Sequence, residues 1–202
     1  MRNSDSMDAD LVEEIEYMLD LLTKSGFFSI EEIHEILEDQ FIEEEIDFSN
    51  FDISLNDGSN ENFSKLENAF TKLAGEDIVA IHNCGYDIEE GVGDAFELYV
   101  HLLNNKFRAG GFCFYTFEDV EEAVFDKILK VTFADFENDE SKALDVGKTV
   151  ARYLKEENFT IKWDESVNSQ IEINPFIWDK SYDGEKEYEI EGAYDVFTGV
   201  RK

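Results

Sequence analysis

The sequence has little cysteine, little proline and few basic residues. Cys84 and Cys113 are the only cysteines among 202 residues, too few for a disulfide framework or for a zinc site with four cysteine ligands. Pro175 is the single proline, which excludes a proline-rich linker protein. Lys and Arg number 17 against 49 Asp and Glu, so the formal net charge is −32. Nucleic acid and anionic membranes are therefore excluded as partners, because phosphate groups attract the opposite sign.

Long apolar runs are also missing. No stretch approaches the roughly 20 residues of a membrane helix, and the amino terminus has no basic start followed by an apolar segment. With so few cysteines, we expect a soluble protein of the reducing cytoplasm. Hydrophobic residues still make up 43% of the chain and include 18 Phe, which is enough for a sizeable core.

The acidic charge is distributed unevenly. Residues 1–60 contain 18 acids against Arg2 and Lys24, whereas residues 61–202 contain 31 acids against 15 bases. Both parts carry a net charge of −16, so the shorter part is more than twice as acidic per residue. We therefore expect an acidic segment over residues 1–60 and a separate domain over residues 61–202.

Apolar residues at steps of three and four predict two helices in the acidic segment. The first helix is expected to end at Gly26, and the second begins with the capping-box pair Ser29 and Glu32. Asn, Asp, Ser and Gly then gather at residues 56–60. The segment is therefore predicted to be an acidic helical hairpin followed by a linker or long loop.

From residue 62 onward, helical and strand patterns alternate. Helices are predicted at 63–75, 94–105, 118–125 and 140–157, and strands at 77–83, 112–116, 128–133, 160–163 and 170–173. Weaker patterns at 188–190 and 196–197 favour one or two edge strands. The short connection between 163 and 170 predicts an antiparallel pair. The expected fold class is mixed α and β, with a mixed sheet of four to six strands flanked by helices.

Polar residues follow the first two predicted strands of this domain. The candidate pocket residues are His82, Cys84, Tyr86, Tyr115 and Asp119. Open α/β sheets bind ligands beyond the carboxyl ends of their strands, and a thiolate beside an imidazole is a workable nucleophile. The plainer interpretation is the polar end of a buried strand, because no nearby base would lower the pKa of the thiol. No catalytic residue is assigned.

Motifs for metals and phosphates fail at essential positions. Asp179 begins a segment that matches the first half of a calcium loop, but Ile190 stands where a bidentate Glu is required. Gly91 and Gly93 lack the third glycine of a dinucleotide motif and indicate a loop before a helix. We expect no metal site and no cofactor.

Acidic side chains crowd the second predicted helix. The candidate interface residues are Glu31, Glu35, Glu38, Asp39 and Glu43. Like charges four residues apart cost a few tenths of a kcal/mol each, which indicates either a solvated face or a docking surface for a basic partner. Two functions are therefore carried forward. One is a non-catalytic immunity-like or inhibitor-like protein that binds a basic protein, and the other is a small enzyme or ligand-binding protein that uses the candidate pocket.

Several sequence blocks occur in order between Phe63 and Trp178. They include IVAIHNCGY at 78–86, GFCFY at 111–115 followed by Glu118 and Asp119, and KWD at 162–164. By these blocks the chain resembles an uncharacterised bacterial family, a domain of unknown function with no established activity. In such relatives a His commonly stands where this chain has Thr116, and a Gly where it has Ala134. The resemblance leaves the acidic hairpin outside its span.

Overall fold

The structure is a computed structural model that describes residues 9–44, 46–48, 51–184 and 186–201. The chain divides into two compact units. Unit 1 comprises Met1–Asn60 and Asp179–Glu185, and unit 2 comprises Glu61–Trp178 and Lys186–Lys202. Unit 1 thus takes in a segment near residue 180 that the sequence alone placed in the second domain. No helix in the described part of the chain is long and apolar enough to cross a membrane.

The helical hairpin of unit 1 is confirmed. Helix α1 spans Ala9–Ser25, and helix α2 spans Ile30–Gln40. The turn between them follows the sequence signals, because Gly26 has a φ of 72° and the capping box of Ser29 and Glu32 is formed at the start of α2. Ile33 on α2 is fully buried, so the apolar stripes of the two helices form the core of this unit.

A segment from late in the sequence completes unit 1. Lys180 is 1% exposed, and its Nζ donates a hydrogen bond of 2.7 Å to the carbonyl oxygen of Gly26. A Cβ atom on Gly58 would lie 2.0 Å from the carbonyl oxygen of Asp179, so only glycine allows this close approach. The side chain of Asn60 accepts a hydrogen bond of 2.9 Å from the backbone of Ser181. The predicted loop before residue 62 is therefore held in place by the segment around Lys180.

The sheet of unit 2 is mixed, as predicted. Its five strands are β1 (Ile78–Ile81), β2 (Gly111–Phe114), β3 (Leu129–Asp135), β4 (Ile161–Lys162) and β5 (Ile171–Ile173), in the order β1-β2-β3-β5-β4. Strands β1 and β2 are parallel, and the other neighbouring pairs are antiparallel. The predicted antiparallel pair is β4 with β5.

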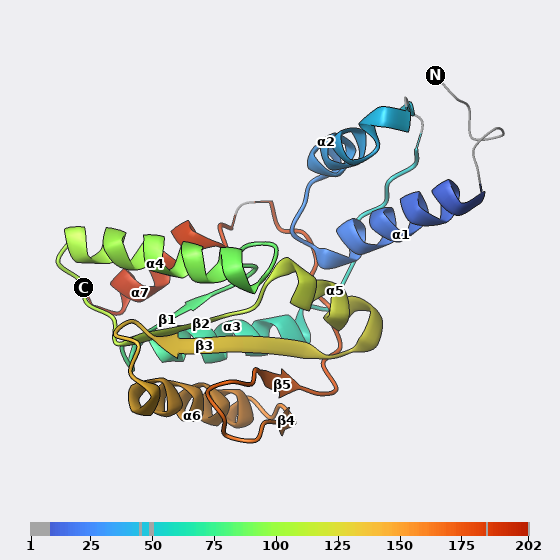
Figure 1. Ribbon diagram of the computed structural model, residues 1–202. Coiled ribbons are helices and arrows are strands. Elements are labelled where there is room, and N and C mark those ends of the chain that lie inside the picture. Colours follow the sequence, from blue (N-terminus) through green and yellow to red (C-terminus); the bar gives the residue numbers. More distant parts are fainter. Residues whose placement is uncertain (1–8, 45, 49–50, 185, 202) are drawn as a thin grey trace. The chain divides into compact units, whose positions relative to one another are not determined.

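Helices cover both faces of this sheet (Figure 1). They are α3 (Glu61–Ala74), α4 (Ile88–Asn104), α5 (Phe117–Asp126), α6 (Glu140–Glu156) and α7 (Ile190–Gly199). Helices α4 and α7 share one core cluster with Phe112 and Phe114 of β2. Helices α3 and α6 pack together, α3 against β1 and α6 against β2 and β3. The parallel pair β1 and β2 is connected through α4, as parallel strands require a crossover.

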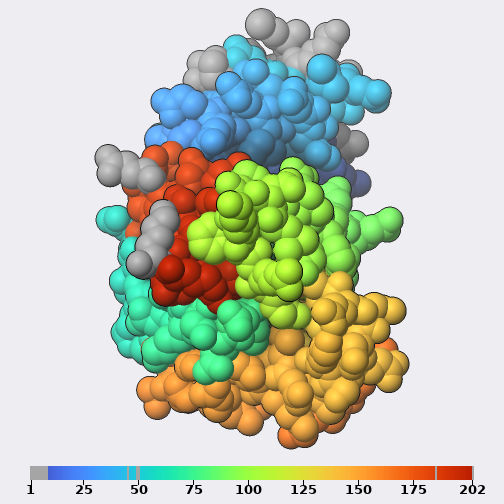
Figure 2. Space-filling view, turned by 90° about the vertical axis from the view of Figure 1, so that its left-hand side faces the viewer, coloured from blue at the N-terminus to red at the C-terminus, as the bar shows by residue number. Residues whose placement is uncertain are grey.

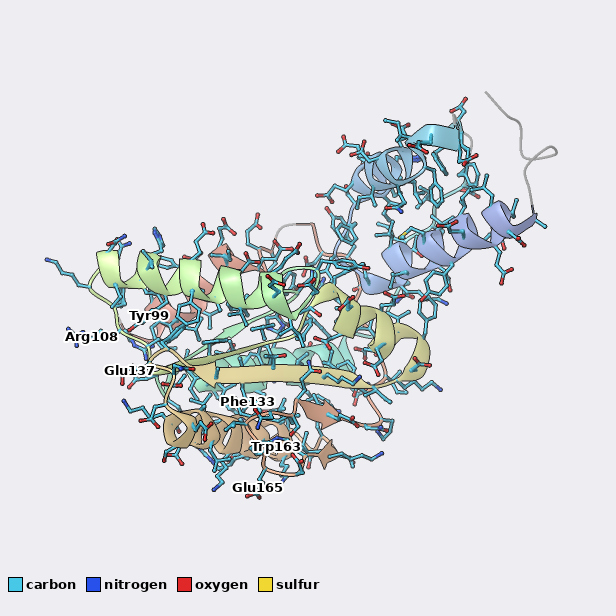
Figure 3. All side chains as sticks on the ribbon, in the orientation of Figure 1. Tyr99, Arg108, Phe133, Glu137, Trp163 and Glu165 are labelled. Carbon is cyan, nitrogen blue, oxygen red and sulfur yellow. The ribbon has the colours of Figure 1, made fainter. Side chains whose placement is uncertain are left out.

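Close packing on the α6 side depends on Gly147. A Cβ atom at this position would lie 2.5 Å from the Phe133 ring and 2.8 Å from the Trp163 ring. These two rings meet edge to face at 5.2 Å, below the sheet in the view of Figure 3. Helix α6 can therefore approach β3 and the strand pair beside it only without a side chain at residue 147.

Two sequence predictions for unit 2 are wrong. Residues 188–190 and 196–197 were expected to be edge strands, but residues 190–199 form α7, because Ala193 and Phe197 are spaced to bury one helical face. Gly91 and Gly93 were expected in a loop, but they lie inside α4, which begins at Ile88. A Cβ atom on Gly91 would lie 2.5 Å from the Phe114 ring, so this glycine serves helix packing.

Candidate functional site

The segments that follow β1 and β2 lie side by side, as expected for parallel strands. The backbone amide of Cys84 donates a hydrogen bond of 2.9 Å to the carbonyl oxygen of Tyr115. Further along, the amides of Phe117 and Glu118 each donate at 3.1 Å, to Gly85 and Tyr86 respectively. All five candidate pocket residues therefore lie along one edge of the sheet.

His82 and Tyr115 are brought into direct contact. The distance from His82 Nδ1 to the Tyr115 hydroxyl is 3.0 Å. Tyr115 is fully buried, and this burial, followed by the charge of Glu67, raises the pKa of its phenol well above the usual value, so the hydroxyl stays protonated. The rings of Phe63, Phe70 and Tyr188 surround the imidazole at centroid distances of 5.5, 4.5 and 5.9 Å. His82 is thus packed among aromatic rings.

The cavity beside His82 is small. Its volume is about 40 Å³, and Phe70, Lys186, Tyr188 and Ala193 are among its other lining residues. That volume suits about one water molecule, whereas pockets for small ligands usually measure about 300–1,000 Å³. The other four candidate pocket residues, all of them described, do not line this cavity.

Cys84 is held as a neutral thiol. Its Sγ donates to the carbonyl oxygen of Gly91 at 3.4 Å, and the side chain is 1% exposed. Burial raises the pKa of the thiol well above its usual range, and the negative charges of Asp94 and Glu189 raise it further. The thiolate that nucleophilic catalysis needs is therefore strongly disfavoured.

Asp119 belongs to a helix cap. Its Oδ2 accepts hydrogen bonds from the backbone amide and the hydroxyl of Thr116, at 2.9 and 3.0 Å. In return the Thr116 hydroxyl accepts from the amide of Asp119 at 3.2 Å, which completes a capping box on α5. Thr116 thus has a structural role in this cap. Tyr86 is 53% exposed and lies 6.5 Å from the ring of Phe117.

The candidate interface forms one face of α2. We name Glu31, Glu35, Glu38 and Asp39 of α2, with Glu43 of the following 3₁₀ turn, the α2 acidic face. All five carboxylates are exposed, and none has an ion-pair partner among the described residues. On the opposite side of the helix Ile33 and Leu37 are fully buried. The last turn of α2 contains no basic residue, so Glu38 and Asp39 face the negative end of the helix dipole.

Unit 1 has a second acidic feature that the sequence reasoning missed. A groove of about 580 Å³ is lined by Glu13, Glu16, Asp20 and Asp52, together with Tyr17 and other residues. We name it the α1 acidic groove. The spacing of Glu13, Glu16 and Asp20 on α1 was a readable signal, because steps of three and four lie on one helical face. Asp52 lies in the loop between α2 and α3, and only the tertiary structure brings it beside these three side chains.

Cations in unit 1 are already engaged. Among its described residues they are Lys24 and Lys180. Lys24 lies 2.5 Å from the carboxylate of Asp20 at an exposed site, and Lys180 is buried against Gly26. The α2 acidic face and most of the α1 acidic groove therefore project uncompensated negative charge.

Among the described residues, no three His, Cys, Asp or Glu side chains are grouped to hold a metal ion. In the comparison with protein families, residues 8–182 match the domain of unknown function DUF6891. The chain belongs to this family. No curated protein and no solved structure matches the chain.

The DUF6891 match corrects the span expected from the sequence blocks. It begins at residue 8 and so includes the acidic hairpin, which the resemblance from Phe63 to Trp178 left out. The segment around Lys180 that completes unit 1 also lies inside the match. The helical hairpin is therefore part of the DUF6891 domain, because its core and its closing segment belong to the same match.

Proposed function

We propose that this protein is a non-catalytic binding protein that engages a basic protein partner through the acidic surface of unit 1. The observation that carries the proposal is the α2 acidic face, where the exposed carboxylates have no ion-pair partner among the described residues and the last turn of the helix contains no basic residue. Their mutual repulsion lowers stability, and a basic partner would remove it. An immunity-like or inhibitor-like protein would use such a surface to cover the basic surface of a toxin or a nucleic-acid-binding protein, because opposite charges attract across the interface.

The α1 acidic groove supports the same proposal by its shape. The shallow groove gathers the carboxylates of Glu13, Glu16, Asp20 and Asp52 at one place, where they can bind Lys and Arg side chains of a partner together. Tyr17, which is 44% exposed, adds an aromatic surface on which a guanidinium group can stack. A cytoplasmic location accompanies the proposal, and it is supported by two cysteines that are both free thiols.

The candidate pocket gives less support to an enzyme. Its His82 cavity is water-sized, Cys84 is held as a thiol, and Asp119 caps a helix. A catalytic site needs a reacting group that a substrate can reach. The proposal is therefore for binding without chemistry.

The test compares two quadruple variants in capture experiments from a cell lysate. In the first, Glu31, Glu35 and Glu38 become Gln and Asp39 becomes Asn, changes that keep the helix propensity of α2 close to that of the wild type. We expect the wild type to retain a basic protein at about 0.05 M NaCl and to release it by about 0.5 M. The first variant should bind the captured protein about tenfold more weakly.

The matched control removes the same charge from unit 2. Four exposed acids, Glu118, Asp126, Glu140 and Asp145, are changed to the corresponding amides. This variant should retain the captured protein as the wild type does. Equal losses in the two variants would mean that net charge alone drives capture, and retention of no basic protein by the wild type would contradict the proposal.

A further inference from the structure

Helices α4 and α7 form a groove on the outer face of unit 2. The two helices lie side by side in Figure 2, α4 in lime green and α7 in red. The groove measures about 550 Å³, and its lining includes Val100, Ile190 and Tyr194 as apolar residues. Acidic residues also line it: Glu97 on α4, with Glu191 and Asp195 on α7. His101 and Asn104 complete the lining, so the groove combines apolar, acidic and polar side chains.

Exposed apolar side chains also run along α4, and one of them, Val100, lines the groove. Ile88, Phe96, Val100 and Leu103 are 45%, 41%, 55% and 42% exposed. Their spacing places them on one side of the helix, over a length of about 22 Å at 1.5 Å per residue. Apolar side chains aligned in this way on a surface mark an interaction site more often than scattered ones do. The length suits a protein segment better than a small molecule.

The carboxylates in and beside the groove form no ion pairs in the described part of the chain, although His101 is among the lining residues. Asp94, Glu97, Glu189, Glu191 and Asp195 have no ion pair with any described residue. Burial raises the pKa of Asp94, and the charges of Glu97 and Glu90 add to the effect. Partial burial of the Glu189 carboxylate raises its pKa in the same way, followed by the charges of Asp94 and Glu191. These acids therefore repel one another at close range.

A buried amide beside these acids has an unused acceptor. Asn83 is 6% exposed, and its Nδ2 donates to Glu189 Oε1 at 3.3 Å. Its Oδ1 has no hydrogen-bond partner among the described residues, which is unusual for a buried polar atom. Solvent does not reach this oxygen, so the amide serves to hold Glu189 in place, and a partner's ammonium or guanidinium group, with its three to five N–H donors, would bind the carboxylates.

We propose that the α4–α7 groove docks a basic amphipathic segment of a protein partner. An aliphatic side chain of the segment lies over Val100 and Tyr194, and its Lys or Arg side chains bind the carboxylates of Asp94 and Glu189. This is the groove mode of peptide recognition, in which apolar anchors give affinity and flanking charges give orientation. A basic segment is favoured over a second copy of this chain, because two molecules of charge −32 repel each other. The inference stands on unit 2 alone and needs neither acidic surface of unit 1.

The test uses two synthetic peptides of about 18 residues, a length that spans the exposed apolar side chains of α4. The first has Leu on one helical face and Lys elsewhere, and the second has Ser in place of every Leu. We expect the Leu peptide to bind about tenfold more tightly than the Ser peptide in fluorescence anisotropy at about 0.15 M NaCl. Amide shifts in ¹⁵N-labelled protein should map to residues 88–104 and 189–195.

Single substitutions locate the site, each with a matched control. Val100→Ser and Asp94→Asn should each weaken binding of the Leu peptide by about fivefold. The controls are Ile177→Ser, at a side chain 48% exposed, and Asp145→Asn, at an exposed site on α6, and both should leave binding unchanged. Because these sites are accessible to solvent, circular dichroism should show the wild-type fold in all four variants.

Three results would overturn the inference. Equal affinity for the two peptides would show that apolar contacts do not contribute to binding. Amide shifts confined to α1 and α2 would show that the peptide binds to unit 1. Self-association that is lost in Val100→Ser, measured by sedimentation velocity, would make a second copy the occupant. None of these measurements involves the α2 acidic face variant, so a failure here and a failure of the proposed function are separate results.

Discussion

Asp119 shows how a residue that suggests chemistry can be committed to structure. Burial raises the pKa of its carboxyl, although the hydrogen bonds from Thr116 and Gln170 act in the opposite direction. When both the folded and the unfolded chain are protonated, the buried carboxyl costs little. The carboxyl of the unfolded chain ionises near its ordinary pKa of 3.8, whereas the buried carboxyl of the folded chain ionises only at a higher pH. As the pH rises through this range, the folded state must bury a charge, so the free energy of unfolding falls.

The variant Asp119→Asn should therefore change the pH dependence of stability. Its melting temperature should fall less than that of the wild type between about pH 4 and pH 7, by a difference of about 2 °C. Thermal melts followed by circular dichroism across this range would measure the difference. The other carboxylates titrate in both proteins and cancel. Parallel pH profiles for the two proteins would contradict a raised pKa at Asp119.

The proximity of the candidate pocket residues was predictable, and the burial of Cys84, Tyr115 and Asp119 was not. His82 and Tyr115 follow two strands whose parallel pairing places them at one edge of the sheet, and the structure puts them 3.0 Å apart. The spacing of Thr116 and Asp119 is itself a capping signature, so their role could have been read from the sequence. The aromatic rings around His82 come from α3 and from residues just before α7, which no local pattern brings together.

At the scale of elements, two glycines in helices should respond in opposite ways to the same change. Gly147→Ala places a Cβ atom 2.5 Å from the Phe133 ring, so we expect a loss of about 1–3 kcal/mol in the free energy of unfolding. Gly93→Ala is the matched control, because no atom lies within 4 Å of its Cβ position, and it should gain up to about 1 kcal/mol. Urea unfolding followed by tryptophan fluorescence measures both. A loss at Gly93, or none at Gly147, would contradict this packing.

Most elements were predictable because their apolar spacing is regular. Helix α6 and strand β3 carry clear patterns with periods of 3.6 and 2, and both form as predicted. Helix α7 was misread because Tyr188 to Ile190 and Val196 to Phe197 look like short strand segments when taken separately. The burial of Ala193 and Phe197 against the α4 side of the sheet decides for a helix, and that contact is not visible in a local window.

At the scale of the whole molecule, the charge of −32 should make stability depend on salt. Raising NaCl from about 0.01 M to about 1 M shortens the Debye length from about 30 Å to about 3 Å and so weakens repulsion between carboxylates. We expect the melting temperature to rise by about 5 °C. The α2 acidic face variant should show a smaller rise, because four of its repelling charges are gone. An equal rise in the melting temperatures of the two proteins would show that repulsion is not concentrated on this face.

The sequence by itself determined the sign and uneven distribution of charge, the helical hairpin, and the mixed sheet with its helices. Those features follow from composition and from short-range periodicity, which any stretch of about ten residues displays. The tertiary structure decided what depends on contacts between distant residues. In unit 1, Lys180 hydrogen-bonds to Gly26, far from it in the sequence. In unit 2, aromatic rings pack around His82, and α4 lies beside α7 to form a groove. Such contacts depend on packing and on the burial of single polar groups, which no local pattern in the chain records.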